Sequence, residues 1–125
     1  MPDHVFKPET LAIHAGQIPD AATGARALPI YQTTSFVFDS AAQAAARFTG
    51  GEDGFVYSRF TNPTVSMFQD RLAALEGAEA CVATATGMSA ILAMAMALLK
   101  AGDHVLCSSA VFGTTVTLFS GILAR

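Results

Sequence analysis

Hydrophobic residues recur at helical spacing in the stretch that follows residue 60. Asn62 and Pro63 precede this stretch and Gly77 follows it. An asparagine at the N-cap accepts a hydrogen bond from a free amide, and proline suits the first helical position because an N–H there has no partner. The apolar positions are Val65, Phe68, Leu72 and Leu75. The pattern predicts a helix that begins at Pro63 and is closed by Gly77.

Two short apolar runs flank a second predicted helix. Residues 80–85 (ACVATA) and 104–109 (HVLCSS) are typical of short buried strands, and residues 88–100 between them are typical of a helix. This order predicts a βαβ unit with parallel strands and a right-handed crossover. Two parallel strands leave both faces and both edges uncovered, and the apolar stretch 113–125 predicts one more helix without a cap signal. We therefore predict that this chain is the amino-terminal part of a larger protein with an α/β fold.

The first sixty residues lack a sustained hydrophobic period. Residues 13–38 contain four turn-forming positions, Ser40 is a candidate N-cap for a short helix over 41–48, and residues 49–54 are typical of a flexible loop. An extended, partly apolar segment of this kind cannot bury itself. We therefore expect residues 1–60 to form an arm that contacts a neighbouring subunit, and residues 61–125 to begin a larger domain.

Composition and charge exclude several classes of protein. Of the 125 residues, 52% are hydrophobic and 14% are charged, which excludes a disordered tail. The net charge of −3 argues against nucleic-acid binding. The longest apolar run, residues 90–99, is about half of what spans a bilayer, so we interpret it as a buried helix and expect no membrane partner.

Cysteines and histidines give little support for a metal site. Cys81 and Cys107 are far apart and form no CxxC motif, which argues against a disulfide framework or a zinc site and favours the reducing cytoplasm. His14 and His104 have no companions at metal-ligand spacing. We interpret both histidines as structural and predict no metal.

Thr86, Gly87 and Met88 connect the first predicted strand to its helix. Free amides at the start of a helix, together with the Thr86 hydroxyl, form a potential anion site, and Gly87 lets an anion approach the backbone. A turn of this kind is more often a plain connection. The motifs GxGxxG and GxxxxGK[ST] are both absent, so a nicotinamide-binding βαβ protein is a weak alternative.

Three further side chains are candidates for the same site. Tyr57 and Arg59 are two apart in a segment expected to be extended, so they would project to one side and could both donate to a phosphate. The alternative is a surface arginine packed beside a tyrosine. Phe112 follows the second predicted strand, where it could stack on a planar ring or belong to the core. Glu52 and Asp53 are expected to be solvated.

Several motifs in one order resemble a known family. "AIHAGQ", "PIYQTTSF", "YSRFTNPT", "LAALEGAEACVATATGMSAI", "AGDHVLCSS" and "VFGTT" are similar to the amino-terminal part of the Cys/Met-metabolism (transsulfuration) family of pyridoxal-phosphate enzymes. The resemblance implies a fold-type-I large domain, with a mostly parallel sheet and flanking helices. It implies pyridoxal 5′-phosphate as the cofactor and a homo-oligomer, a dimer of dimers at full length.

The resemblance also assigns roles to the candidate residues. It implies that Tyr57 and Arg59 reach into a neighbouring subunit's site and hold the cofactor phosphate, with Tyr57 also handling a proton near the substrate. It implies that the turn from Thr86 to Met88 binds the same phosphate through backbone amides and that Phe112 stacks on the pyridine ring. The family's Schiff-base lysine has no counterpart here, so this chain alone is expected to be inactive.

Phenylalanine at position 112, in "VFGTT", resembles the O-succinylhomoserine sulfhydrylase branch, because lyases and γ-synthases of the family usually carry tyrosine there. The substrates implied are a homoserine ester and a sulfur nucleophile, with homocysteine as the product for methionine biosynthesis. Cystathionine γ-synthase and O-acetylhomoserine sulfhydrylase remain alternatives. A non-catalytic module that only pairs with a partner subunit is an alternative of another class.

Overall fold

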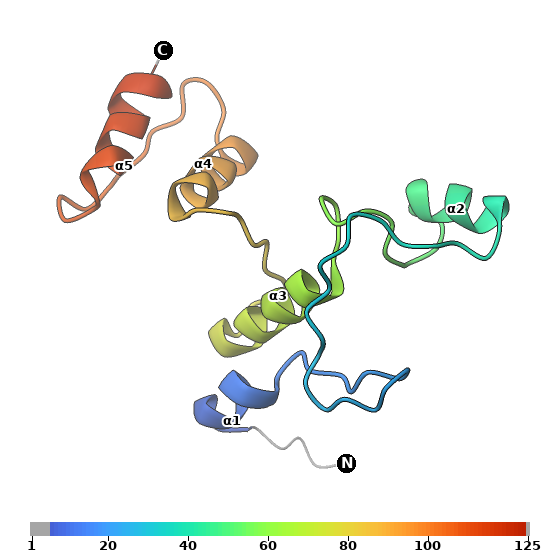
Figure 1. Ribbon diagram of the computed structural model, residues 1–125. Helices are drawn as coiled ribbons and strands as arrows, with labels where there is room; N and C mark the ends of the chain where they lie inside the picture. The colour runs from blue at the N-terminus through green and yellow to red at the C-terminus, as the bar shows by residue number, and fades with distance from the viewer. Residues whose placement is uncertain (1–5, 125) are drawn as a thin grey trace. The chain divides into compact units, whose positions relative to one another are not determined.

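The structure, a computed structural model, describes residues 6–124. Its contacts group into two compact units, Met1–Val82 and Ala83–Arg125. The helices of the first unit are α1 (Pro8–His14), α2 (Ala41–Phe48) and α3 (Pro63–Glu76). Those of the second are α4 (Gly87–Leu98), α5 (Gly113–Thr117) and the π-helix η1 (Leu118–Ile122), all coloured along the chain in Figure 1. This division into units does not show which residues contact a neighbouring subunit. The predicted arm over residues 1–60 and the predicted domain start over residues 61–125 therefore stay predictions.

The predicted helix after residue 60 is confirmed as α3. The Asn62 side chain accepts a hydrogen bond from the Thr64 amide at 2.9 Å, and Pro63 is the first helical residue. Gly77 ends the helix at φ 65°, a left-handed conformation that glycine adopts without a Cβ clash. Local capping chemistry therefore sets both ends of α3.

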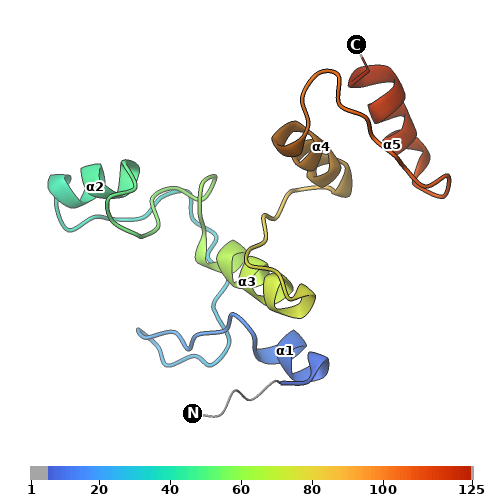
Figure 2. The same ribbon diagram turned by 180° about the vertical axis from the view of Figure 1, so that it is seen from behind.

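Helix α1 packs against α3 and was not predicted from the sequence (Figures 1 and 2). The chain leaves α1 through Gly16, whose φ is 67°, and a Cβ at this position would lie 2.8 Å from the Asp70 Cβ. Arg71 of α3 donates from Nε to the Ala15 carbonyl at 3.0 Å. The short helix is thus held by contacts with residues more than fifty positions later in the chain.

Helix α2 confirms the short helix expected after Ser40. The Ser40 hydroxyl accepts a hydrogen bond from the Gln43 amide at 3.1 Å, which satisfies one of the free donors at the helix start. The chain after α2 turns back on the helix, where the Gly51 amide donates to the Ala46 carbonyl at 2.8 Å.

A polar cluster organises the loop between α1 and α2. The Asp20 carboxylate accepts hydrogen bonds from the hydroxyl and the amide of Thr23, at 2.6 and 2.9 Å, and one from the Tyr31 hydroxyl at 3.2 Å. The Thr23 hydroxyl and then the Thr23 amide lower the pKa of Asp20. Desolvation, followed by the hydrogen bond to Asp20, raises the pKa of Tyr31.

The lowered pKa of Asp20 predicts a loss of stability in acid. Because the pKa is lower in the folded state, the carboxylate stabilises the fold fully above the ordinary aspartate value of about 3.9. This contribution is lost as the pH falls through the folded-state pKa. We expect Asp20→Asn to flatten the acid limb of the thermal unfolding midpoint plotted against pH in the full-length protein. Acid limbs of equal slope in the two proteins would contradict this account.

In the second unit α4 packs against α5, which continues into η1. Ala95 of α4, Thr115 of α5 and Leu118 of η1 are buried, with 3–6% of their surface exposed. The last predicted helix therefore forms, but its end widens into a π-turn, in which the Leu123 amide donates to the Leu118 carbonyl five residues earlier.

The two predicted strands do not form, so the expectation of a βαβ unit is not met in the residues that the structure describes. Residues 80–85 and 104–109 run as irregular segments, and Val82 and Leu106 are 81% and 100% exposed. A strand exists only when a neighbour satisfies its backbone groups, and parallel strands need cover on both faces. The mostly parallel sheet of the expected α/β fold thus has no counterpart within residues 6–124.

Helix α4 is made almost entirely of apolar residues. It covers 12 residues, and no helix among the described residues is both long and apolar enough to cross a membrane.

Candidate functional site

Tyr57 lies where the chain changes from a paired to a turned conformation. Tyr57 forms an isolated antiparallel bridge with Ser35, flanked by hydrogen bonds from the Phe36 amide to the Val56 carbonyl (3.2 Å) and from the Ser58 amide to the Thr34 carbonyl (2.9 Å). This pairing joins the segment that precedes α2 to the segment that follows it. It fixes the backbone immediately before Arg59.

The expectation of an extended backbone through Arg59 is wrong. The Tyr57 carbonyl accepts hydrogen bonds from the amides of Phe60 and Thr61, at 2.9 and 3.1 Å, so the chain turns directly after Tyr57. The turn nevertheless brings the two side chains together. The Arg59 guanidinium carbon lies 5.6 Å from the centre of the Tyr57 ring and 4.7 Å from that of Phe60.

Arg59 keeps its donors available. Its side chain is exposed, it stacks on two aromatic rings, and it forms no ion pair with any residue between 6 and 124. Tyr57 is 39% exposed. An unpaired guanidinium beside a phenol is a donor set suited to a phosphate or a carboxylate.

Asn62 joins this turn to α3 and to the preceding segment. It is 6% exposed, and its Nδ2 donates to the Tyr31 carbonyl at 2.9 Å and to the Ser58 hydroxyl at 3.0 Å. Ser58 in turn donates to the Thr33 carbonyl. The same asparagine that begins α3 therefore holds the turn that carries Arg59, a second role that its N-cap position did not predict.

The turn before α4 has the geometry of an anion site. The Thr86 hydroxyl accepts from the Ser89 amide, and the Ser89 hydroxyl accepts from the Thr86 amide, both at 3.1 Å. This capping box leaves the amides of Gly87 and Met88 at the helix start without a hydrogen-bond partner among the described residues. No atom lies within 4 Å of a Cβ built at Gly87, so an anion can approach the backbone there.

Ser89 is a functional candidate that sequence reasoning missed. Ser89 lies three residues after Thr86, which is the spacing of a capping box, with serine in place of the usual Glu or Gln. This spacing could have identified Ser89 from the sequence. The Thr86 hydroxyl is used inside this box, so the backbone amides of the next two residues are the free donors.

Phe112 stands at the start of α5 with 73% of its surface exposed. The prediction left open a core position, and the structure places its ring outside the packed core of the second unit. Met88 links the starts of α4 and α5, because its sulfur accepts hydrogen bonds from the hydroxyls of Thr114 (3.3 Å) and Thr115 (3.8 Å). The free amides and the exposed ring thus belong to neighbouring helix starts.

The candidate residues form two sets. Tyr57 and Arg59 belong to the first unit, and Thr86, Gly87, Met88 and Phe112 belong to the second. One set offers a guanidinium and a phenol. The other offers free amides, which suit an anion, and an exposed aromatic face, which suits a planar ring.

Comparison with known proteins identifies the family. The family model described as "Cys/Met metabolism PLP-dependent enzyme" matches residues 9–125. An O-succinylhomoserine sulfhydrylase of Pseudomonas aeruginosa is 55% identical over 119 residues, which are 94% of this chain and 29% of the relative. An O-acetyl-L-homoserine sulfhydrylase of Corynebacterium glutamicum is 51% identical over 117 residues, which are 94% of this chain and 27% of the relative.

A solved structure gives the same result. A Campylobacter jejuni protein described as an O-acetylhomoserine (thiol)-lyase superposes with a TM-score of 0.86 at 40% identity, covering 94% of this chain and 29% of that one. It carries a pyridoxyl-lysine monophosphate. This chain thus spans about three-tenths of the length of the relatives that it matches. It belongs to the Cys/Met-metabolism family of enzymes that depend on pyridoxal 5′-phosphate.

Proposed function

We propose that this chain is the amino-terminal part of an enzyme that makes homocysteine from O-succinylhomoserine and sulfide. The observation that carries the proposal is the 55% identity to an O-succinylhomoserine sulfhydrylase, which extends over both candidate sets of residues. The donors described above fit the cofactor of this family. Bound pyridoxal phosphate supplies an electron sink for the bonds at the substrate's α-carbon.

The second unit supplies the cradle for the cofactor. The amides of Gly87 and Met88 donate to its phosphate, since they are free at the start of a helix and no side chain blocks the approach. Thr86 positions these amides through its capping box with Ser89. Phe112 stacks on the pyridine ring with its exposed aromatic face.

The first unit supplies donors to a neighbouring subunit's site. Arg59 gives a charge-assisted contact to the phosphate, and the Tyr57 hydroxyl donates to the same phosphate. Tyr57 also handles a proton near the substrate. The stacking of Arg59 on Tyr57 supports a common target for the two side chains. This arrangement requires a homo-oligomer, which we propose is a dimer of dimers.

The leaving group is the finer part of the proposal. An O-acetylhomoserine sulfhydrylase is a second candidate function, favoured by the 51% identity to such an enzyme. The experiment is a comparison of kcat/KM for O-succinylhomoserine and O-acetylhomoserine, each with sulfide, in the full-length enzyme. The proposal expects the succinyl ester to be preferred, and a preference for the acetyl ester would replace it by the second candidate.

We place the reaction in the reducing cytoplasm, where Cys81 and Cys107 stay free thiols.

Phe112 provides a prediction on reaction type. A phenyl ring stacks as well as a phenol does, so Phe112→Tyr should leave cofactor affinity unchanged. The added hydroxyl is a proton donor and acceptor, which helps the departure of a thiolate more than that of a carboxylate. We expect the variant to raise kcat/KM for cystathionine cleavage, relative to ester sulfhydrylation, by about tenfold or more.

The control for this prediction is Phe119→Tyr, which adds the same hydroxyl on η1. It should leave the ratio of the two reactions unchanged. A parental enzyme that cleaves cystathionine faster than it sulfhydrylates the ester would contradict the sulfhydrylase assignment while leaving the family intact.

A further inference from the structure

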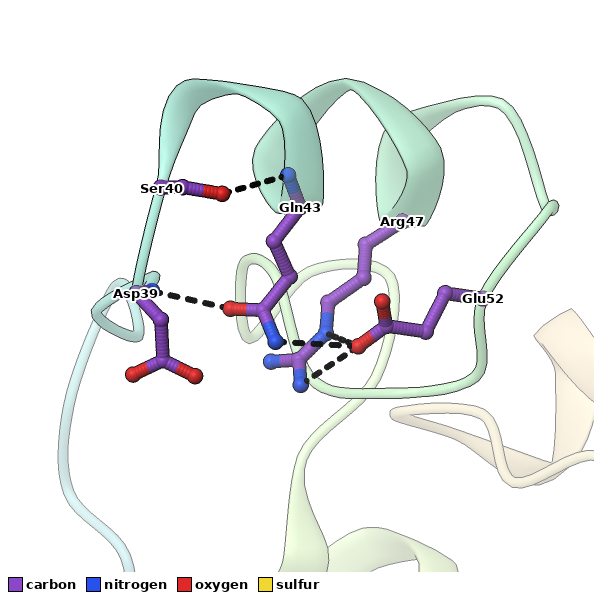
Figure 3. A network of polar contacts seen from close by, with 5 residues as sticks. All are labelled: Asp39, Ser40, Gln43, Arg47 and Glu52. Carbon is purple, nitrogen blue, oxygen red and sulfur yellow. Dashed lines mark hydrogen bonds and ion pairs between the residues drawn. The ribbon is translucent and has the colours of Figure 1, made fainter.

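Three polar side chains join α2 to the loop that follows it (Figure 3). Gln43 and Arg47 lie four residues apart on one side of α2 and converge on a single oxygen of Glu52. Gln43 donates from Nε2 to Glu52 Oε1 at 3.1 Å, Arg47 donates from Nε at 3.0 Å, and Arg47 Nη2 lies 2.9 Å from the same oxygen. Glu52 was expected to be solvated; its side chain is indeed exposed, but the sequence did not predict its pairing with Gln43 and Arg47.

This Gln43–Arg47–Glu52 cluster also holds the segment that enters α2. The Asp39 amide donates to Gln43 Oε1 at 2.8 Å, so one side chain bridges the incoming and the outgoing backbone (Figure 3). The Arg47 side chain lies flat over Gly54, where a Cβ would be 2.6 Å from Arg47 Nε. The outgoing loop is thus fixed at Glu52 by charge and at Gly54 by contact.

The fixed loop leads directly to the turn that carries Tyr57 and Arg59. Two residues separate Gly54 from Tyr57, and the ring of Phe55 lies 5.4 Å from that of Phe36 on the incoming segment. Val56 is 8% exposed, and the Ser35–Tyr57 bridge follows. The segment from Ser35 to Tyr57, which contains α2, is therefore held at α2 by the cluster and at its two ends by the Ser35–Tyr57 bridge.

We propose that the Gln43–Arg47–Glu52 cluster is a positioning device, which sets the backbone from which Tyr57 and Arg59 reach an anion. The inference rests on the proposed function, in which these two side chains hold the cofactor phosphate. The cluster touches neither substrate nor cofactor. It acts by limiting the directions in which Arg59 can point, and a guanidinium needs a fixed direction for bidentate contact with phosphate.

The partial exposure of the cluster separates this role from simple stabilisation. The side chains of Arg47 and Glu52 are 21% and 41% exposed, and ion pairs in contact with solvent add little to the free energy of unfolding. The loss of such a pair should therefore change unfolding slightly. It should change the alignment of Arg59 more, because that alignment depends on the loop between Glu52 and Tyr57.

The test compares Glu52→Ala with Asp53→Ala in the full-length enzyme. Both remove one carboxylate from the same loop, but Asp53 is exposed and forms no hydrogen bond or ion pair with the described residues. The apoenzymes are titrated with pyridoxal 5′-phosphate and with pyridoxal, which lacks the phosphate. We expect Glu52→Ala to weaken binding of the phosphorylated form about fivefold and to leave pyridoxal binding unchanged. Asp53→Ala should change neither, and Glu52→Gln, which keeps the acceptor oxygen, should recover part of the loss.

Each outcome decides the inference. Equal weakening of both ligands by Glu52→Ala would indicate a general structural effect and overturn the positioning role, and so would no weakening of either. Arg59→Ala is measured in parallel to separate the inference from the proposed function. If Arg59→Ala also leaves phosphate-dependent binding intact, the phosphate-holding role that the proposed function gives to Arg59 fails. If Arg59→Ala weakens it and Glu52→Ala does not, only the positioning role fails.

Discussion

Arg59→Ala in the full-length enzyme is expected to weaken the binding of pyridoxal 5′-phosphate by roughly ten- to a hundredfold. The guanidinium is exposed, has no ion pair within residues 6–124 and is held against Tyr57 and Phe60. A charge-assisted hydrogen bond to an anion contributes about 1.5–3 kcal/mol, which corresponds to this loss of affinity. The measurement is a titration of the apoenzyme with the cofactor, in which binding is monitored through the visible absorbance of the bound cofactor.

Arg26→Ala is the matched control for this prediction. Arg26 is also an exposed arginine of the first unit, and its carbonyl, not its side chain, accepts a hydrogen bond from Gln17 Nε2 at 2.7 Å. Its removal changes the net charge by the same amount without touching the turn after Tyr57. Equal cofactor affinities for the two variants would show that Arg59 acts only through general charge.

Asn62→Ala is expected to cost about 2–4 kcal/mol of the free energy of unfolding. The substitution removes the N-cap of α3 and leaves the Tyr31 carbonyl and the Ser58 hydroxyl without their donor. Asn62 is buried, with 6% of its surface exposed, so water cannot easily replace these contacts. The measurement is urea unfolding of the full-length protein. Cofactor affinity should also fall, because the turn that carries Arg59 loses its support.

Thr61→Ala provides the comparison. Thr61 precedes Asn62, its side chain is exposed, and its contact with the Tyr57 carbonyl is made by the backbone amide. We expect Thr61→Ala to change the free energy of unfolding by no more than about 0.5 kcal/mol, as ordinary surface substitutions do. An Asn62→Ala variant as stable as Thr61→Ala would contradict the central position given to Asn62.

The helix starts could be predicted from the sequence because their causes are local. Ser40 and Asn62 each cap a helix with a side chain that reaches two or three residues ahead, and both were predicted as caps. Thr86 caps α4 in the same way but was not predicted as a cap. Gly77 ends α3 by the conformation that glycine permits. Helix α1 escaped prediction because Lys7 at its N-cap gives no side-chain hydrogen bond, and its packing on α3 joins distant parts of the chain.

The strands and the turn at Arg59 could not be predicted for a related reason. Residues 80–85 have the composition of a strand, yet a strand needs a paired neighbour, and composition does not supply one. The turn after Tyr57 depends on Asn62, which links it to Tyr31, 31 residues earlier. The candidate residues and the free amides at the start of α4 were found from residue type and resemblance, whereas the Thr86–Ser89 capping box and the stacking of Arg59 came from the geometry.

The central claim is that Arg59 of one subunit completes the cofactor site of another, whose phosphate is held by Gly87 and Met88. The most direct test mixes full-length Arg59→Ala with a variant that lacks the cofactor-binding lysine, at a cofactor concentration that leaves Arg59→Ala largely unloaded but saturates the parental enzyme, and measures activity after subunit exchange. The account predicts recovery of roughly a quarter of the parental activity, because half of randomly formed dimers are hybrids with one intact site of two. No recovery in hybrids verified by mass would place Arg59 in its own subunit's site, or in none, and would contradict the account.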